Sequence, residues 1–510
     1  TDTLNYDTSK EKNPKPHVID RVHFKQDMEG FLDRRHTHLY LLTIETKKLD
    51  TLTRGDYDEK SPAWSPDGKQ LAFVSNRTAD PDRNENADIW IMDATPKANA
   101  RQLTTWTGSD VSPAWSPDGK SIAYIRSASS NNYLMYDGSL LAVIPSSGGE
   151  PILLTASLDR PSYSAPVWSL NGASIAMVIG DDRKHYIIEV PAKGGAITKV
   201  LEGNRSFYTI EKNPAGGWLS MMSEPQLPSE LYAIENNTLR RLTHHQDEFV
   251  NSVELSTVEG FTSKSKDGTI VSGLLNIPPN TTAKKLPLIL YIHGGPVSQD
   301  DWGFDLSRHI LAADGYAVAG VNYRGSDSRG VAFQKAIYGD WGNKEVIDLL
   351  GAVDHLVKQG IADPDKLGVG GWSYGGILTN YLIASDTRFK AAVSGAGSAL
   401  QLSLFGVDQY ILQFENELGM PWNNLDRYLK LSYPFLKANR IKTPTLYMVG
   451  EKDFNVPSVG SEQMYEALRV QGVPTKLIIY PGQFHGLTIP SYRKDRYTRY
   501  LQWYNTYLKK

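Results

Sequence analysis

The chain contains no cysteine among its 510 residues. Disulfides, thiolate metal sites and a cysteine nucleophile are therefore excluded. No apolar run reaches the roughly 18 residues of a membrane span, and the polar N-terminal stretch 1–17 lacks the apolar core of a signal peptide. We therefore expect a soluble chain without a membrane partner. We favour a cytoplasmic location and leave a periplasmic or secreted one open.

Strong charge of either sign is also missing, since the formal net charge is −3. Such a balance gives no general attraction to nucleic acid, and we expect no nucleic-acid partner. Metal-ligand spacing and a phosphate-binding glycine loop are absent too, so we expect no cofactor and no metal. Homo-oligomerisation stays open. The hydrophobic fraction of 40% is enough for real cores, and the length predicts two domains.

The first half of the chain repeats itself. SPAWSPDGKQLAFVS begins at Ser61, SPAWSPDGKSIAYIR begins at Ser112, and a degraded copy, APVWSLNGASIAMVI, begins at Ala165. A second mark, a leucine-threonine pair, recurs in phase at Thr53, Thr104, Thr155 and Thr243. Each PDG is a tight turn before an alternating strand, so each unit is a small antiparallel sheet. A period of about 50 residues predicts the blades of a β-propeller.

The repeats provide four full blades and the rear half of another, which starts near residues 38–46. A propeller must close to protect its edge strands. We expect either that blades upstream are missing from this chain, which we favour, or that the N-terminal segment completes the ring. The sequence pattern changes near residue 255, from repeated strand units to apolar runs separated by helical stretches. We therefore predict a propeller domain over 1–255 and a second domain over 256–510.

The second half predicts a mostly parallel α/β sheet. A hairpin at 258–279 is followed by short apolar runs, and helical stretches such as 343–360 and 461–472 separate these runs. Buried strands that alternate with helices are typical of parallel sheets, whose ligand sites lie at the carboxyl ends of the strands.

GVGGWSYGG, residues 368–376, surrounds Ser373 with five glycines. It contains the G-x-S-x-G pattern between a predicted strand and a predicted helix, the context of a nucleophile elbow. Such a serine needs a base and an orienting carboxylate, in the chain order Ser, Asp, His. Asp453 and His485 each follow a late strand, and we predict a Ser373–Asp453–His485 triad. The early strand that ends in YIHGGP predicts an oxyanion hole formed by the backbone N–H groups of Gly295 and Tyr374.

Substrate-binding residues are harder to read. Glu85, Glu415 and Glu417 are candidates to hold a free peptide amine, and a solvated surface is their simpler interpretation. Arg324 is a candidate for a substrate carbonyl or carboxylate, and a structural ion pair explains it at least as well.

These motifs together resemble the prolyl oligopeptidase family of serine peptidases, closest to its acylaminoacyl-peptidase and dipeptidyl-peptidase-like branch. The resemblance covers essentially the whole chain. It implies a β-propeller of WSPDGK-type blades, incomplete here, followed by an α/β-hydrolase domain. It also implies Ser373 as nucleophile, Asp453 as orienting acid, His485 as general base and acid, and a site that faces the propeller and admits short peptides. The motifs that carry it are WSPDGK, HGGP, NYRGS, GWSYGG, G-x-x-D-x-x-V-P and FHG.

Two features depart from the family pattern. Relatives of the dipeptidyl-peptidase IV type have an oxyanion tyrosine where this chain has His293, so Gly295 is the better donor, although Trp372 gives the GWSYGG form of that branch. Family members carry seven or eight blades, whereas this chain has room for about five.

Three functions follow from the sequence. A serine peptidase that cleaves short peptides through an acyl-enzyme is favoured, of acylaminoacyl-, dipeptidyl- or oligopeptidase type. A carboxylesterase or amidase with the same triad is the alternative. A propeller scaffold with an idle hydrolase domain is the third, and the intact set of Ser373, Asp453 and His485 argues against it.

Overall fold

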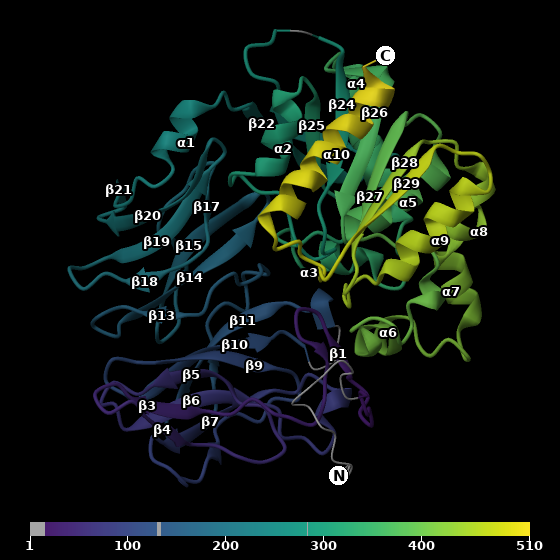
Figure 1. Ribbon diagram of the computed structural model, residues 1–510. Coiled ribbons are helices and arrows are strands. Elements are labelled where there is room, and N and C mark those ends of the chain that lie inside the picture. Colours follow the sequence, from purple (N-terminus) through teal and green to yellow (C-terminus); the bar gives the residue numbers. More distant parts are fainter. Residues whose placement is uncertain (1–15, 130–133, 283, 510) are drawn as a thin grey trace.

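The computed structural model describes residues 16–129, 134–282 and 284–509 in two parts (Figure 1). Small antiparallel sheets succeed one another from the bottom of the view to its left side, and a mostly parallel sheet with flanking helices occupies the upper right. The first 15 residues of the predicted propeller domain lie outside the described ranges. Both predicted fold classes are confirmed.

The propeller blades are built from strands that pair in sequence order. A two-stranded sheet comes first, two four-stranded sheets follow, and a nine-stranded sheet joins the last two blades. The strands are β3 (Tyr40–Thr43), β4 (Lys48–Thr51), β5 (Lys60–Trp64), β6 (Gln70–Ser75), β7 (Asp88–Asp93), β8 (Arg101–Gln102), β9 (Asp110–Trp115), β10 (Ser121–Ser127), β11 (Ser139–Pro145), β12 (Ile152–Leu153), β13 (Val167–Trp168), β14 (Ser174–Asp181), β15 (Lys184–Pro191), β16 (Thr198–Lys199), β17 (Ser206–Phe207), β18 (Glu211–Lys212), β19 (Trp218–Glu224), β20 (Leu227–Glu235) and β21 (Thr238–Arg241).

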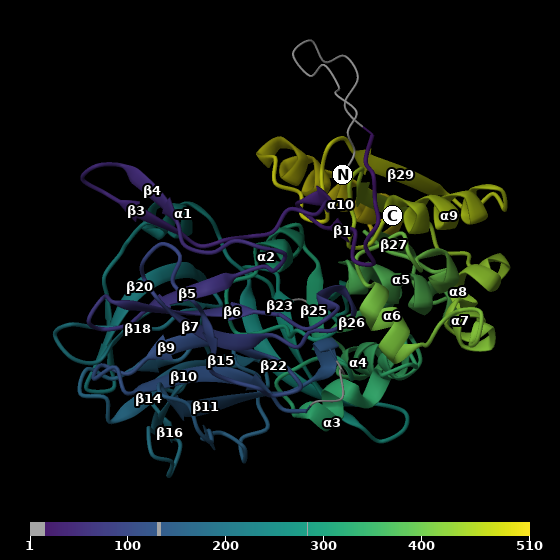
Figure 2. The same cartoon turned by 90° about the horizontal axis from the view of Figure 1, so that it is seen from below.

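The half-blade predicted near residues 38–46 is the β3–β4 pair. Over the described residues the blades do not close into a ring. A separate hairpin of β1 (Lys25–Gln26) and β2 (Gly30–Phe31) lies apart from the blades, between them and the α/β part, in both Figure 1 and Figure 2.

The repeated tryptophan joins each blade to the one before it. The indole N–H of Trp115 donates to the carbonyl of Ala63 at 3.1 Å, and that of Trp168 donates to the carbonyl of Ala114 at 2.9 Å. Trp64, at the same place in the first complete blade, is 50% exposed. Among the described residues, the half-blade β3–β4 is the one propeller sheet that precedes that blade. The repeat therefore has a physical cause, which is the contact between successive sheets.

The repeated threonine closes each blade in a similar way. Each hydroxyl accepts the N–H of a residue 12 to 15 positions earlier, at 2.8–3.0 Å. The bond joins a threonine that lies just after the last strand of a blade to the strand before it, or, for Leu39, to the residue next to that strand. The four pairs are Leu39 with Thr53, Ile89 with Thr104, Leu141 with Thr155, and Leu231 with Thr243.

The α/β part is an eight-stranded sheet in the order β22-β23-β25-β24-β26-β27-β28-β29. The first two pairings are antiparallel and the other five are parallel. The strands are β22 (Thr257–Lys264), β23 (Ile270–Ile277), β24 (Leu286–Ile292), β25 (Ala317–Asn322), β26 (Ala362–Trp372), β27 (Ala391–Gly395), β28 (Thr445–Gly450) and β29 (Thr475–Tyr480).

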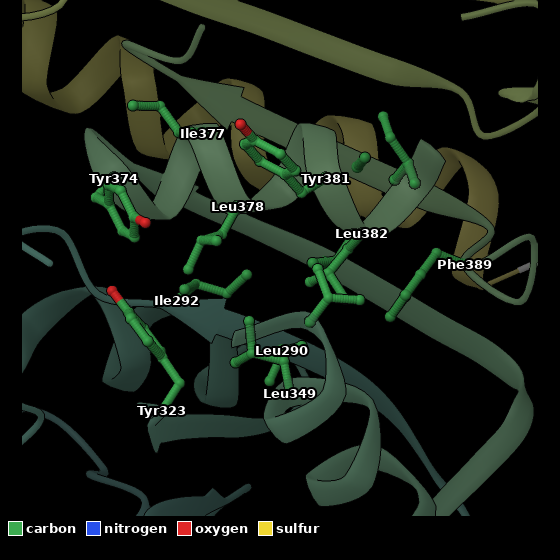
Figure 3. Close-up of a cluster of buried hydrophobic side chains, with 14 of the residues drawn as sticks. Leu290, Ile292, Tyr323, Leu349, Tyr374, Ile377, Leu378, Tyr381, Leu382 and Phe389 are labelled. Carbon is green, nitrogen blue, oxygen red and sulfur yellow. The ribbon is translucent and has the colours of Figure 1, made fainter. Parts of the chain in front are cut away.

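Helices cover both faces of this sheet. Leu349 of α4, Leu378 of α5 and Met464 of α9 belong to one apolar cluster, and Leu311 of α2 and Tyr504 of α10 belong to the other. Figure 3 shows the first cluster, where α5 packs on β24. The helices are α1 (Asp247–Ser252), α2 (Leu306–Ala313), α3 (Val331–Gln334), α4 (Lys344–Lys358), α5 (Tyr374–Ser385), α6 (Ile411–Glu417), α7 (Leu425–Leu431), α8 (Tyr433–Leu436), α9 (Ser458–Arg469) and α10 (Pro490–Leu508).

The last propeller strand, β21, ends at Arg241, and the first strand of the large sheet, β22, begins at Thr257. We propose the domain boundary between these two strands, after residue 255. None of the helices in the described ranges combines the length and the apolar character that a membrane crossing needs.

Candidate active site

Ser373 occupies the sharp turn between β26 and α5. Its backbone has φ 61° and ψ −126°, a conformation that is costly for a residue with a side chain. The turn is held from both sides, because the N–H of Ser373 donates to Gly395 at 3.0 Å and its carbonyl accepts from Ile377 at 2.9 Å. Strain that is held in this way is typical of a nucleophile elbow.

The surrounding glycines allow the close packing that the turn requires. A Cβ atom on Gly375 would lie 2.1 Å from the carbonyl oxygen of Ile292, and one on Gly371 would lie 2.4 Å from the same oxygen. A Cβ atom on Gly376 would lie 2.1 Å from the carbonyl oxygen of Gly395. Any larger residue would therefore push α5 away from β24 and β27.

Asp453 and His485 lie in contact although 31 residues separate them in the sequence. Asp453 Oδ2 is 2.8 Å from His485 Nδ1, and since a carboxylate can only accept, Nδ1 carries the proton. Asp453 Oδ1 accepts the N–H groups of Asn455 and Val456 at 3.0 and 2.7 Å. Burial raises the pKa of the Asp453 carboxyl, the bond to His485 opposes that rise, and the charge of Asp27 adds to it.

The His485 loop is tied to the elbow itself. The indole N–H of Trp372, next to Ser373, donates to the carbonyl of His485 at 3.1 Å. Among the described residues the Ser373 hydroxyl has no hydrogen-bond partner, and no direct bond joins it to His485. Such bonds are often long before substrate binds.

The predicted oxyanion donors lie on the same pocket as Ser373. Gly295 and Tyr374 both line it. A Cβ atom on Gly294 would lie 3.2 Å from Ser373 Cβ, so the HGGP turn passes directly beside the serine. His293 points elsewhere, because its Nε2 lies 2.9 Å from the Ser326 hydroxyl and its ring stacks on Tyr323.

The pocket beside Ser373 is small, with a cavity volume of about 70 Å³. Most of its wall is apolar or aromatic, and it draws on both halves of the chain, since Met135 and Tyr136 belong to the propeller region. Polar groups at its edge include Asp408 and Gln413. The apolar and aromatic lining residues are Met135, Tyr136, Pro296, Trp341, Tyr374, Ile377, Leu404, Tyr410, Phe414 and Val456.

Arg324 is not among the residues that line this pocket, and its side chain forms two ion pairs. Its guanidinium pairs with Asp348 at 2.8 Å and with Asp267 at 2.6 Å. The structure thus places Arg324 in the structural ion pair that the sequence left open, and we do not include it among the substrate-binding residues.

The three acidic candidates also lie outside the pocket lining. Glu415 forms an ion pair with Arg83 of the propeller region at 2.5 Å. Glu417 is buried, accepts N–H groups of Gly339 and Trp341, and has a pKa that burial raises to about 7. Glu85 is exposed on the loop before β7. Of the three, only Glu85 is exposed and makes no ion pair among the described residues.

Two buried carboxyl groups near Ser373, those of Glu345 and Asp408, belong to no motif that the sequence shows. Glu345 is buried beneath the elbow, where it accepts the hydroxyl of Tyr374 at 2.7 Å and the N–H of Gly342 at 3.0 Å. Burial raises the pKa of Glu345 to about 7. Asp408 reaches the pocket edge, and burial raises its pKa to about 8. Over the described part of the chain, no group of three or more His, Asp or Glu side chains forms a metal-binding cluster.

Two family descriptions match the chain, and together they follow its two parts. Residues 302–510 match the prolyl oligopeptidase family, and residues 31–241 match the TolB β-propeller domain. The Pyrococcus horikoshii acylaminoacyl peptidase has the same fold, with a TM-score of 0.83 at 21% identity over 98% of this chain and 79% of that one.

Two relatives align along most of the chain. The uncharacterized peptidase YuxL of Bacillus subtilis is 29% identical over 502 residues, which cover 95% of this chain and 76% of the relative. Dipeptidyl-peptidase 5 of Porphyromonas gingivalis is 27% identical over 467 residues, which cover 88% of this chain and 67% of the relative.

Proposed function

The chain carries a serine peptidase domain of the prolyl oligopeptidase family, and we propose that it hydrolyses short peptides through an acyl-enzyme on Ser373. The observation that carries the proposal is the convergence of three separate segments. The elbow serine and the glycine-rich turn line one pocket, and the buried aspartate and its histidine lie on loops tied to the elbow through the Trp372–His485 bond.

The chemistry assigns one role to each group. Ser373 Oγ attacks the peptide carbonyl carbon while His485 Nε2 takes its proton, and Asp453 holds the imidazole and stabilises its positive charge. The N–H groups of Gly295 and Tyr374 bind the oxyanion of the tetrahedral intermediate. His485 then passes the proton to the leaving amine. A water molecule, activated by His485 in the same way, releases the acyl group and restores Ser373.

The pocket beside Ser373 is proposed to bind the side chain that precedes the scissile bond. Its largely aromatic wall suits an apolar residue, because burial of apolar surface stabilises binding in proportion to area. The acylaminoacyl- and dipeptidyl-peptidase relatives support a peptide substrate with a short N-terminal part. Glu85 is retained as a candidate for a free amine, whereas Glu415 and Glu417 are occupied by other partners.

A substrate panel tests this function. We expect Ser373→Ala to abolish cleavage of peptides with an apolar residue before the scissile bond, and Ser252→Ala, an exposed serine on α1, to leave it unchanged. Acyl-blocked and free N-terminal peptides in the same panel separate the acylaminoacyl and dipeptidyl types. Cleavage of small esters at a far greater kcat/KM, with no peptide cleavage, would instead establish the carboxylesterase or amidase alternative.

A further inference from the structure

The β1–β2 hairpin reaches the loops that carry Asp453 and His485, although more than 400 residues separate them in the sequence. Asp27, at the turn of this hairpin, accepts the N–H of Phe454 at 3.1 Å. The same carboxylate accepts the N–H of His485, with both oxygens at 3.2 Å. One side chain thus joins the residue after the triad aspartate to the triad histidine itself.

No alternative partner serves these two N–H groups. Among the described residues, neither the Phe454 N–H nor the His485 N–H has an acceptor other than Asp27. A backbone N–H group that is shielded from water is destabilising when it loses its acceptor, so the bonds to Asp27 stabilise both loops. The same loops are also joined by the Lys452 N–H, which donates to Gln483 at 2.8 Å, by the Gly482 N–H, which donates to Glu451 at 2.7 Å, and by the Asp453–His485 bond. The Asp27 carboxylate adds two bonds next to the Asp453–His485 pair itself.

The rest of the hairpin is anchored to the same region. Lys25 Nζ donates to the carbonyl of Val407 at 2.9 Å, and the N–H of Asp27 donates to Gln409 Oε1 at 2.7 Å. The ring of Phe31 lies 5.3 Å from that of Phe454, and Lys25 Nζ lies 5.4 Å from the latter ring. The hairpin turn that carries the carboxylate is therefore held by contacts on both sides, and Figure 1 shows β1 close to α6.

We propose that Asp27 is a positioning residue for the peptidase reaction. Its carboxylate holds the Asp453 loop and the His485 loop in the relative position that the triad requires. The inference rests on the proposed function. It gives the N-terminal hairpin a part in the reaction, since displacement of a catalytic group by about 1 Å can lower a rate about 100-fold.

Steady-state kinetics of Asp27 variants test the inference. Asp27→Ala should lower kcat by about 10- to 100-fold and leave KM within about twofold, because the substrate pocket is untouched. Asp27→Asn should recover kcat to within about threefold of the unchanged protein, because Oδ1 alone can accept both N–H groups. Glu29→Gln is the matched control, since Glu29 is an exposed carboxylate of the same hairpin turn.

The kinetic results distinguish a failure of the Asp27 inference from a failure of the proposed peptidase function. Asp27→Ala with kcat and KM both within twofold of the unchanged protein would overturn the inference, and so would an equal loss in Glu29→Gln. Should Asp27→Ala not fold, Asp27→Ser keeps a polar side chain that is too short to reach both loops, and the same loss of kcat is expected. Peptide cleavage that survives Ser373→Ala would defeat the proposed function whatever Asp27 does, so the two failures are distinct.

Discussion

His485 Nδ1 lies 2.8 Å from Asp453 Oδ2, on a carboxylate whose other oxygen is already bonded to two backbone N–H groups. The carboxylate cannot turn away without losing those bonds, so it sets both the tautomer and the orientation of the imidazole. The Nε2 atom is thereby left free to accept a proton, and we propose that this proton comes from Ser373.

Asp453→Asn should lower kcat on peptides by about 10⁴-fold while the fold survives, because the amide is similar in size but favours the wrong tautomer. Peptide turnover and thermal unfolding of the same sample check this. Asp365→Asn, which changes an exposed carboxylate in the first part of β26, should have no effect on either quantity. A loss of less than tenfold in Asp453→Asn would argue against the assigned role.

The elbow glycines make a stability prediction. Gly375→Ala should destabilise the protein by about 1–3 kcal/mol or prevent folding, because its Cβ would meet the Ile292 carbonyl at 2.1 Å. Gly486→Ala is the control, since nothing lies within 4 Å of a Cβ atom there. Denaturant unfolding measures both, and equal stability of the two variants would contradict the close packing of α5 on β24.

The repeated tryptophans offer a matched comparison. Trp168→Phe removes the donor to the Ala114 carbonyl from a buried position, and we expect a loss of about 1–3 kcal/mol of unfolding free energy. Trp64→Phe changes the same motif position where the ring is half exposed, and we expect a change within about 0.5 kcal/mol. Denaturant unfolding of both variants checks the prediction, and similar losses would show that the blade-to-blade bond is not what the repeat provides.

Glu345 predicts a pH dependence of stability. The pKa of Glu345 is about 7 in the folded protein and 4.5 in the unfolded chain. The folded state therefore binds the proton more tightly, and the free energy of unfolding is highest below pH 4.5 and falls as the pH rises through 7. The shift corresponds to about 3 kcal/mol. Glu345→Gln should therefore flatten the decline of unfolding free energy over this range.

Unfolding by denaturant at several pH values between 4.5 and 8 measures this effect as the difference from the unchanged protein. Glu466→Gln, an exposed position on α9, should leave the curve unaltered. An undiminished decline in Glu345→Gln would mean that Glu345 remains ionised throughout.

Local patterns predicted much of the fold. The WSPDGK and leucine-threonine repeats locate the blades because the Trp115, Trp168 and threonine side chains make bonds that recur from sheet to sheet. The half-blade predicted near residues 38–46 is the β3–β4 pair. The order of strands and helices predicted the parallel sheet, and the relation of Ser373 to the carboxyl ends of β24 and β26 followed from that topology.

Contacts between distant segments could not be predicted in this way. Asp27 meets His485 across 458 positions, and no periodicity or turn signal encodes such a pair. Glu415 was a plausible amine ligand in isolation, yet Arg83 neutralises it once the two halves of the chain meet. Glu345 belongs to no sequence motif, and its role becomes visible because the first turn of α4 places it beside the Tyr374 hydroxyl.

The most direct test of the account is mass spectrometry of the folded protein after reaction with a fluorophosphonate, followed by peptide mapping and a cleavage assay on the same sample. The account predicts one adduct per chain on Ser373 and a loss of peptide cleavage in proportion to labelling. An adduct on another serine, or full peptide cleavage by protein that is completely modified at Ser373, would contradict it.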